Sequence, residues 1–135
     1  MSDQNRELGA SNSTSCAKTV QLNYLAALIT QPIWVAPWPC IVTHIVGRPI
    51  VAGTNGSAVS LSFYKAPSGT AVGSGTLLHT GSYNMKGTID TNQTLELATN
   101  SDSITLAAGD CIGYVLTGTA TAAIGTVTVT VEPLA

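Results

Sequence analysis

The sequence predicts an all-β fold, a single antiparallel β-sandwich or jelly roll of about eight or nine strands. Short segments in which apolar and polar residues alternate recur along the chain, and turn-forming residues separate them. Alternation with a period of two is typical of antiparallel strands that bury one face. Threonine recurs in these segments, and its β-branched side chain suits a pleated surface. A chain of 135 residues is the size of one such domain.

We expect residues 1–18 to be a flexible N-terminal arm. They are mainly serine, asparagine, glutamine and charged residues, which cannot bury enough apolar surface to fold alone. Leu8 is the only large aliphatic residue of this arm besides Met1, so it is the candidate contact residue there. Disorder is the default, although the arm could become ordered by lying on a neighbouring subunit. Residues 19–135 are expected to form the sandwich domain.

The domain begins with an ambiguous segment. The apolar residues of 20–29 fit either one face of a helix or one face of a strand. The strand is favoured because the rest of the chain reads as β. Residues 33–36 come next and lead into Pro37 and Pro39. Prolines remove the backbone donors of a ladder, which predicts an edge strand or a crossover.

Residues 40–50 alternate and are predicted to form a long strand. One face would carry Ile41, Thr43 and Ile45, and the other face would carry Val42, His44 and Val46. Asn55-Gly56 follows, and between two β segments this dipeptide is the strongest short hairpin signal. We therefore expect the strand over 40–50 to pair with the strand after it.

The second half of the chain supplies the remaining strands. Val59, Leu61 and Phe63 alternate with polar neighbours, and Ala-Pro-Ser-Gly at 66–69 predicts a turn. A loop is expected as far as Gly75. Further strands are then predicted at 77–85 with a bulge at Gly81, and at 93–98, 104–106, 111–117 and 125–132.

The chain has few charged residues. They make up 9% of it, against about 25% in typical globular proteins. The net charge of -2 with only five basic residues argues against a nucleic-acid partner, which needs clustered lysine and arginine. Either the protein is soluble through its hydroxyl groups, or much of its surface is covered in an assembly. The scarcity of charge on the predicted sheet edges favours the assembly.

No targeting or membrane segment is apparent. Residues 2–7 are polar and acidic, where a signal peptide needs basic and then apolar residues. No apolar run approaches the roughly 20 residues of a membrane span. We therefore expect synthesis in a cytosol and no membrane partner.

Patterns that carry chemistry are weak. Ser62 and Lys65 match the S-x-x-K nucleophile signature, but residues three apart on a strand point to opposite faces. His44 and His79 lie on separate predicted strands, where a lone histidine is more often a satisfied sheet residue or an interface group. We assign no catalytic residue, no metal ligand and no cofactor, and we place His44 among the candidate interface residues.

The three cysteines, Cys16, Cys40 and Cys111, show no C-x-x-C spacing. Free thiols are the favoured interpretation, and a bridge between Cys40 and Cys111 or a zinc site is the alternative.

Trp34 and Trp38 lie close together among prolines. They are expected either to plug an open end of the sandwich or, together with Pro37, to anchor an interface, since tryptophan is a common interface hot spot. A sugar-binding platform ranks last, because no carboxylate or amide cluster adjoins them.

Four parts of the sequence resemble a known group of proteins. They are Ala36-Pro37 leading into Cys40-Ile-Val-Thr-His-Ile, Gly73-Ser-Gly-Thr-Leu-Leu with Met85-Lys-Gly-Thr, Leu106-Ala-Ala-Gly-Asp-Cys-Ile-Gly-Tyr-Val-Leu-Thr-Gly-Thr, and Gly125-Thr-Val-Thr-Val-Thr-Val-Glu-Pro-Leu. Through them, residues from about 20 to 135 resemble the small β-sandwich proteins of tailed bacteriophages that decorate or cement the head.

The resemblance implies a role and not an active site. It implies a non-enzymatic virion protein, made in the host cytoplasm, that binds the outer surface of the phage head. The implied partners are the major capsid protein and two further copies of the chain in a homotrimer. The main alternative is a fibre-tip or receptor-binding module that recognises host glycans. A minor structural subunit of the head ranks behind these two, and an enzyme ranks last.

Overall fold

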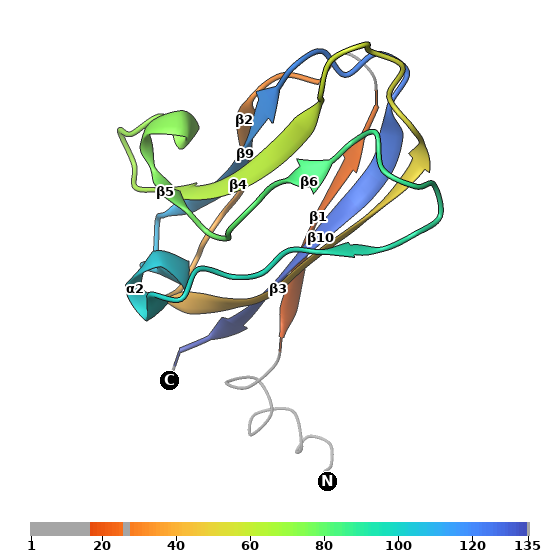
Figure 1. Cartoon of the computed structure of the whole chain (residues 1–135). Coiled ribbons are helices and arrows are strands. Elements are labelled where there is room, and N and C mark those ends of the chain that lie inside the picture. The colour runs from red at the N-terminus through yellow and green to blue at the C-terminus, as the bar shows by residue number, and fades with distance from the viewer. Residues whose placement is uncertain (1–16, 26–27, 135) are drawn as a thin grey trace, which may run out of the picture.

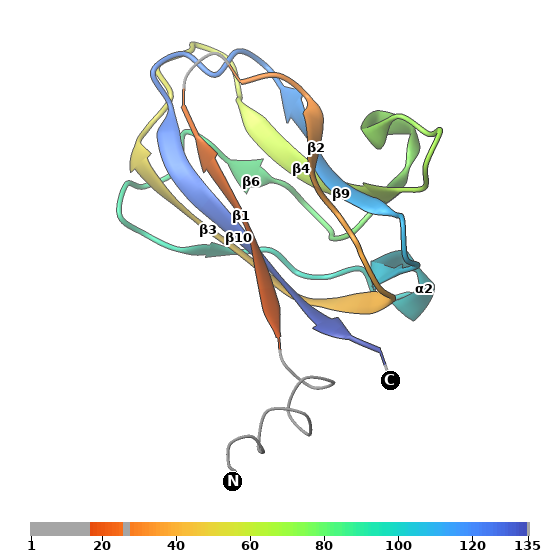
Figure 2. The same ribbon diagram turned by 180° about the vertical axis from the view of Figure 1, so that it is seen from behind.

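The computed structural model describes residues 17–25 and 28–134, and it confirms the all-β sandwich. Two antiparallel sheets of five strands face each other (Figures 1 and 2). The first sheet has the order β1 (Lys18–Tyr24), β10 (Ile124–Pro133), β3 (Cys40–Val51) and β7 (Gln93–Thr94), and β8 (Thr105–Leu106) also pairs with β3. The second has the order β2 (Gln31–Val35), β9 (Cys111–Thr117), β4 (Ser60–Ala66) and β5 (Thr76–Leu77), and β6 (Tyr83–Asn84) also pairs with β4.

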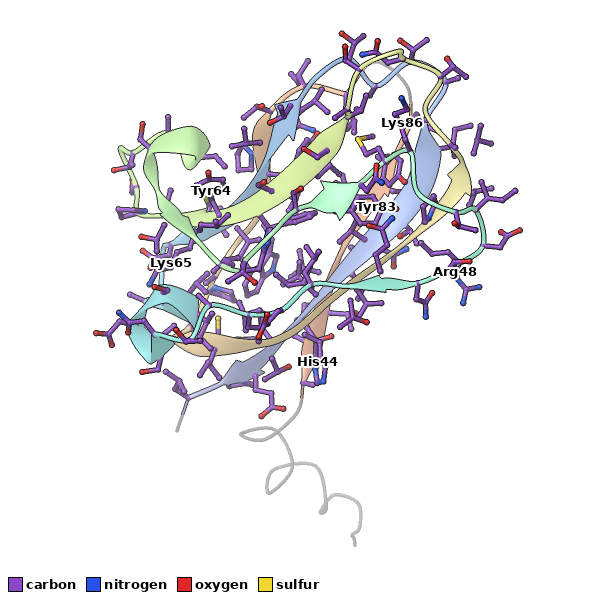
Figure 3. The ribbon with its side chains drawn as sticks, viewed as in Figure 1. His44, Arg48, Tyr64, Lys65, Tyr83 and Lys86 are labelled. Atoms are coloured by element: carbon purple, nitrogen blue, oxygen red, sulfur yellow. The ribbon has the colours of Figure 1, made fainter. Side chains whose placement is uncertain are left out.

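Two short helical turns interrupt the strands of the described chain, a 3-10 turn at Val72–Ser74 and α2 at Ser101–Ile104. Asn100 caps α2 because its side chain accepts a hydrogen bond from the amide of Asp102 at 3.0 Å. Lys65 of β4 also contacts this turn (Figure 3). Its Nζ donates hydrogen bonds to the carbonyl oxygens of Asp102 and Thr105 at 2.5 Å each. The amine of Lys65 therefore links β4 to the segment around α2.

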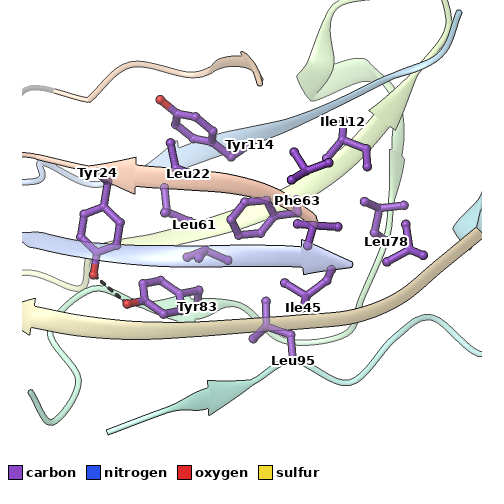
Figure 4. Close-up of a cluster of buried hydrophobic side chains, with 14 of the residues drawn as sticks. Leu22, Tyr24, Ile45, Leu61, Phe63, Leu78, Tyr83, Leu95, Ile112 and Tyr114 are labelled. Atoms are coloured by element: carbon purple, nitrogen blue, oxygen red, sulfur yellow. Dashed lines mark hydrogen bonds between the residues drawn. The ribbon is translucent and has the colours of Figure 1, made fainter. Parts of the chain in front are cut away.

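The core lies between the sheets, and the alternation of the sequence builds it. Val127, Val129 and Val131 of β10 are fully buried, while the threonines between them lie on the outer face of the first sheet. Leu61 and Phe63 of β4 meet them from the second sheet (Figure 4). Burying each large aliphatic or aromatic side chain contributes about 1.5–3 kcal/mol, so these inward rows supply most of the driving force for folding.

Several sequence predictions are confirmed. The strand predicted at 111–117 is β9 with the same bounds, and the favoured strand at the start of the domain is β1. β2 is an edge strand of the second sheet, as the prolines around it indicated. The turn after Ala66 forms, with the amide of Thr70 donating to the carbonyl of Pro67 at 3.0 Å.

The hairpin predicted at Asn55-Gly56 is wrong. β3 and β4, the strands on either side, belong to opposite sheets and do not pair with each other. Residues 52–59 instead cross from one sheet to the other, and the amide of Thr54 donates to the carbonyl of Thr121 at 2.9 Å. The dipeptide therefore lies in a crossover between the sheets. The hairpin prediction failed because tertiary packing, and not the local sequence, decides which strands pair.

The two faces predicted for residues 40–50 are also corrected. The pairing of β10 with β3 shifts register between His44 and Val42, which leaves Thr43 as an extra residue. Val42 and Ile45 are therefore both buried, whereas the prediction placed them on opposite faces. His44 points outwards.

Two further predicted strands are shorter than expected. The segment 77–85 breaks at Gly81, which has a positive φ of 68°, and only two-residue strands remain on either side. The segment 93–98 keeps β7 and a single bridge between His79 and Leu97. Residues 93–97 therefore contact two partners: β7 pairs with β3 of the first sheet, and Leu97 pairs with His79.

The sandwich has two distinct ends, and these position the candidate sites. The terminal end carries the first and last described residues, and it also holds residues 36–39, 67–71, 99–104 and 107–110. The loop end lies opposite and holds residues 25, 28–30, 52–59, 85–92 and 118–123.

Candidate interaction surfaces

His79 is buried, with 1% of its surface exposed, and both of its ring nitrogens are engaged. The amide of Phe63 donates to Nε2 at 2.9 Å, so Nε2 carries no proton. Nδ1 must then hold the proton, and it lies 3.0 Å from the carbonyl oxygen of Thr80, which accepts it. Burial lowers the pKa of His79, while the bond to Thr80 opposes this shift. His79 is a neutral, satisfied sheet residue with no free nitrogen for acid–base chemistry.

His44 lies on the outer face of the first sheet (Figure 3). Its Nδ1 is 3.1 Å from the hydroxyl of the neighbouring Thr43, and Thr130 of β10 stands opposite it. The ring of His44 is exposed to solvent. Its role as an interface residue stays a prediction.

Trp34 and Trp38 pack against each other at the terminal end. Their ring centroids are 5.9 Å apart in an edge-to-face arrangement with an interplanar angle of 67°. Both rings are half-buried and pack against the core, while Pro37 between them is exposed. The pair therefore closes this end of the sandwich and still presents part of its surface to the outside. Leu8, the remaining predicted contact residue, lies outside the described residues.

A surface that the sequence did not reveal lies at the loop end. Seven large apolar side chains of the described residues are exposed, and five of them gather here. We call them the apolar rim: Leu25, Ile29, Ile50, Val51 and Ile89. The exposed fractions run from 40% for Val51 to 65% for Ile29. Large exposed apolar patches mark interaction sites in soluble proteins.

Backbone pairing places the ends of β1 and β3, which carry or adjoin rim residues, at the same end of the sandwich. Val51 lies opposite Ile124 and Pro49 opposite Gly125, at the point where β1 also ends with Tyr24. The amide of Asp90 donates to the carbonyl of Pro49 at 2.8 Å, which places Ile89 beside the end of β3. One local signal was present in the sequence: the doublet Ile50-Val51 breaks the alternation, and both side chains end up exposed.

A shallow hollow of about 240 Å³ opens at the terminal end. It is lined by Pro32, Val35, Ala66, Pro67, Ser68, Gly69, Thr70, Gly109 and Cys111. The lining is mainly apolar, and Val35 remains 60% exposed on one wall.

Cys40 and Cys111 are free thiols, as favoured from the sequence, and Cys16 lies outside the described residues. Cys40 is buried, and burial raises its pKa, with a smaller contribution from the nearby carboxylate of Asp110. Cys111 is half-buried beside the hollow. Within the described residues, no three histidine, cysteine, aspartate or glutamate side chains come together to hold a metal ion.

Among the described residues, no helix has the length and apolar character that a membrane crossing requires. Three surfaces of the described residues are candidates for interactions: the apolar rim, the tryptophan pair and the hollow.

A comparison with family models finds no match, and a comparison with curated proteins finds none either. Among solved structures, the chain is similar to a chain from the capsid of Ralstonia phage GP4, with a TM-score of 0.58 and 10% identity. That likeness covers 90% of this chain and 85% of the other. It is also similar to a chain from the capsid asymmetric unit of cyanophage Pam1, with a TM-score of 0.53, 11% identity, and 90% and 87% of the two chains covered. Two chains from phage capsids thus share the fold of this protein.

Proposed function

We propose that this protein is a structural component of a bacteriophage virion that decorates and stabilises the head. In this proposal it binds the outer surface of the shell of major capsid protein, as a homotrimer. The observation that carries the proposal is the shared fold over 90% of the chain with two chains from phage capsids. The low charge of the sequence and the exposed apolar rim support it, because both suit a protein that is largely covered in an assembly.

The contact with the shell would be apolar. Apolar contacts are not screened by salt, whereas exposed ion pairs weaken at high ionic strength. A trimer would present three copies of one modest contact surface, and linking them raises the overall affinity without any strong single site. We therefore expect purified decorated heads to keep their occupancy across a salt titration. A steep loss of occupancy as salt rises would contradict this contact chemistry.

Either end of the sandwich could form the contact surface for the shell. The rim offers five exposed apolar side chains, and the terminal end offers Trp34, Pro37 and Trp38. Undecorated heads can be incubated with each variant and the bound protein counted by sedimentation and cryo-EM. We expect Ile89→Asp to lower occupancy by at least about tenfold, since it places a charge in an apolar contact.

Thr88→Asp is the matched control, because it adds the same charge at the adjacent exposed position and is expected to bind normally. If Ile89→Asp decorates heads fully while Trp38→Ala does not, the terminal end is the contact surface. A cryo-EM map that places the protein at the tail, together with selective binding on a glycan array, would replace decoration with the receptor-binding alternative.

A further inference from the structure

We propose that the hollow at the terminal end is a docking site for the N-terminal segment of the same chain, with Leu8 seated between Val35 and Pro67. Pro32 and Val35 of β2 line it together with Ala66 and Pro67 from the end of β4 and the turn after it. The inference rests on the hollow and on the position of the chain start, and it holds whether or not the protein decorates a phage head.

The size of the hollow suits one aliphatic side chain. Its volume is about 240 Å³, whereas a cavity of roughly 150 Å³ lined by apolar residues already holds benzene. The four-carbon side chain of leucine is smaller than benzene. The hollow therefore accepts Leu8 together with part of the backbone beside it.

The described chain begins at the end of the sandwich that bears the hollow. β1 starts at Lys18 at the terminal end, and β2 reaches Val35 at the same end (Figure 2). The nine residue steps from Leu8 to Ala17 span up to about 30 Å when extended, more than the width of two packed sheets. A tether of this length gives an effective concentration in the millimolar range, which favours the hollow of the same chain over that of another copy.

The chemistry of the segment matches the hollow. Leu8 and Met1 are the only large aliphatic residues in residues 1–16, so one apolar anchor stands in a polar context. Arg6 lies two residues before Leu8, and it is the only basic residue of that segment. Asp110 lies between Gly109 and Cys111, which both line the hollow. The carboxylate of Asp110 accepts a hydrogen bond from the amide of Ala107 at 2.9 Å, and its negative charge and remaining acceptor sites are complementary to an arginine docked nearby.

The free thiol of Cys111 reports directly on occupancy of the hollow. In a Cys16→Ser background, alkylation of Cys111 by iodoacetamide can be followed by peptide mass spectrometry. A seated Leu8 shields Cys111, and Leu8→Asp should release it. Burial of a leucine side chain corresponds to a population shift of at least about tenfold, so we expect the Cys111 rate to rise by a similar factor. An unchanged rate in Leu8→Asp would overturn the proposal.

Two controls separate docking from other causes. Cys40 is buried, and its alkylation should stay slow in both proteins; a parallel rise at Cys40 would show unfolding and overturn the interpretation. Asn12→Asp adds the same charge to the same segment and should leave Cys111 protected. Protection should also persist on dilution of the protein. If dilution exposes Cys111, the occupant comes from a second copy, and docking within one chain is overturned.

Discussion

Tyr24 of β1 and Tyr83 of β6 share a hydrogen bond of 2.7 Å between their hydroxyl groups, inside the core and between the two sheets (Figure 4). Both side chains are fully buried, and their rings meet edge to face with centroids 5.8 Å apart. Burial raises the pKa of both hydroxyls above the ordinary value, so both stay protonated while the protein is folded. Each hydroxyl is the partner that makes burial of the other tolerable.

Removing both hydroxyls of this pair should cost less than the two single removals added together. Tyr83→Phe leaves the Tyr24 hydroxyl buried without its partner, at a cost of about 1–3 kcal/mol in the free energy of unfolding. Tyr24→Phe should cost a similar amount. The double variant removes both polar groups and should fall well short of the sum. Urea unfolding of the four proteins measures the coupling, and strict additivity would show that the bond contributes nothing.

Gly47 of β3 makes room for the ring of Tyr83. A methyl group built at Gly47 would clash with Cε1 and Cδ1 of that ring and approach Cγ2 of Val127 to 2.9 Å. Gly47→Ala should therefore destabilise the protein by about 1–3 kcal/mol through overpacking. Gly73→Ala is the matched control, since its methyl group meets only Cγ2 of Val115 at an ordinary 3.6 Å. Equal unfolding midpoints for the two variants would refute the overpacking argument.

Local patterns predicted the strands wherever the alternation was regular. β9 and the alternating core residues of β4 and β10 follow from hydrophobic period alone, because one buried face fixes the orientation of every side chain. The bulge at Thr43 and the crossover at Asn55-Gly56 did not follow from it. Both depend on which strands become neighbours, and that is decided by contacts between residues far apart in the sequence.

The candidate surfaces were harder to predict for the same reason. Leu25, Ile50 and Ile89 come from three separate loops or strand ends, and only the folded arrangement places them at the same end of the sandwich. Trp34 and Trp38 were recognisable because they are close in sequence, and the structure shows that each ring combines core packing with partial exposure. The hollow is likewise built by β2, the turn after β4 and the turn before β9.

Lys65 should stabilise the region around α2 more than the rest of the fold. Its two charge-assisted bonds to the carbonyls of Asp102 and Thr105 tie this turn to β4. Lys65→Met keeps the aliphatic stem and removes both bonds, which should lower the local opening free energy by about 1–2 kcal/mol. Hydrogen exchange of residues 101–105 measures this effect.

Lys86→Met is the comparison for this change. Lys86 makes one longer bond of 3.3 Å to the carbonyl of Ser57, so its replacement should alter exchange much less. Faster exchange throughout both sheets in Lys65→Met would show that the lysine supports the whole fold and not the turn.

His79 should make the protein less stable as the pH falls. Burial lowers the pKa of His79 in the folded state, whereas in the unfolded chain it titrates near about 6.5. Below that pH the unfolded state binds a proton that the folded state does not, so the free energy of unfolding falls with falling pH. The slope approaches about 1.4 kcal/mol per pH unit, and the contribution is fully present above the unfolded pKa.

His79→Gln tests this slope, because glutamine can donate one hydrogen bond and accept another without taking up a proton. Urea unfolding at a series of pH values should show a shallower slope for His79→Gln than for the wild type, and His44→Gln is the matched change at an exposed ring. An unchanged slope in His79→Gln would show that the buried ring of His79 is not the source of the acid sensitivity.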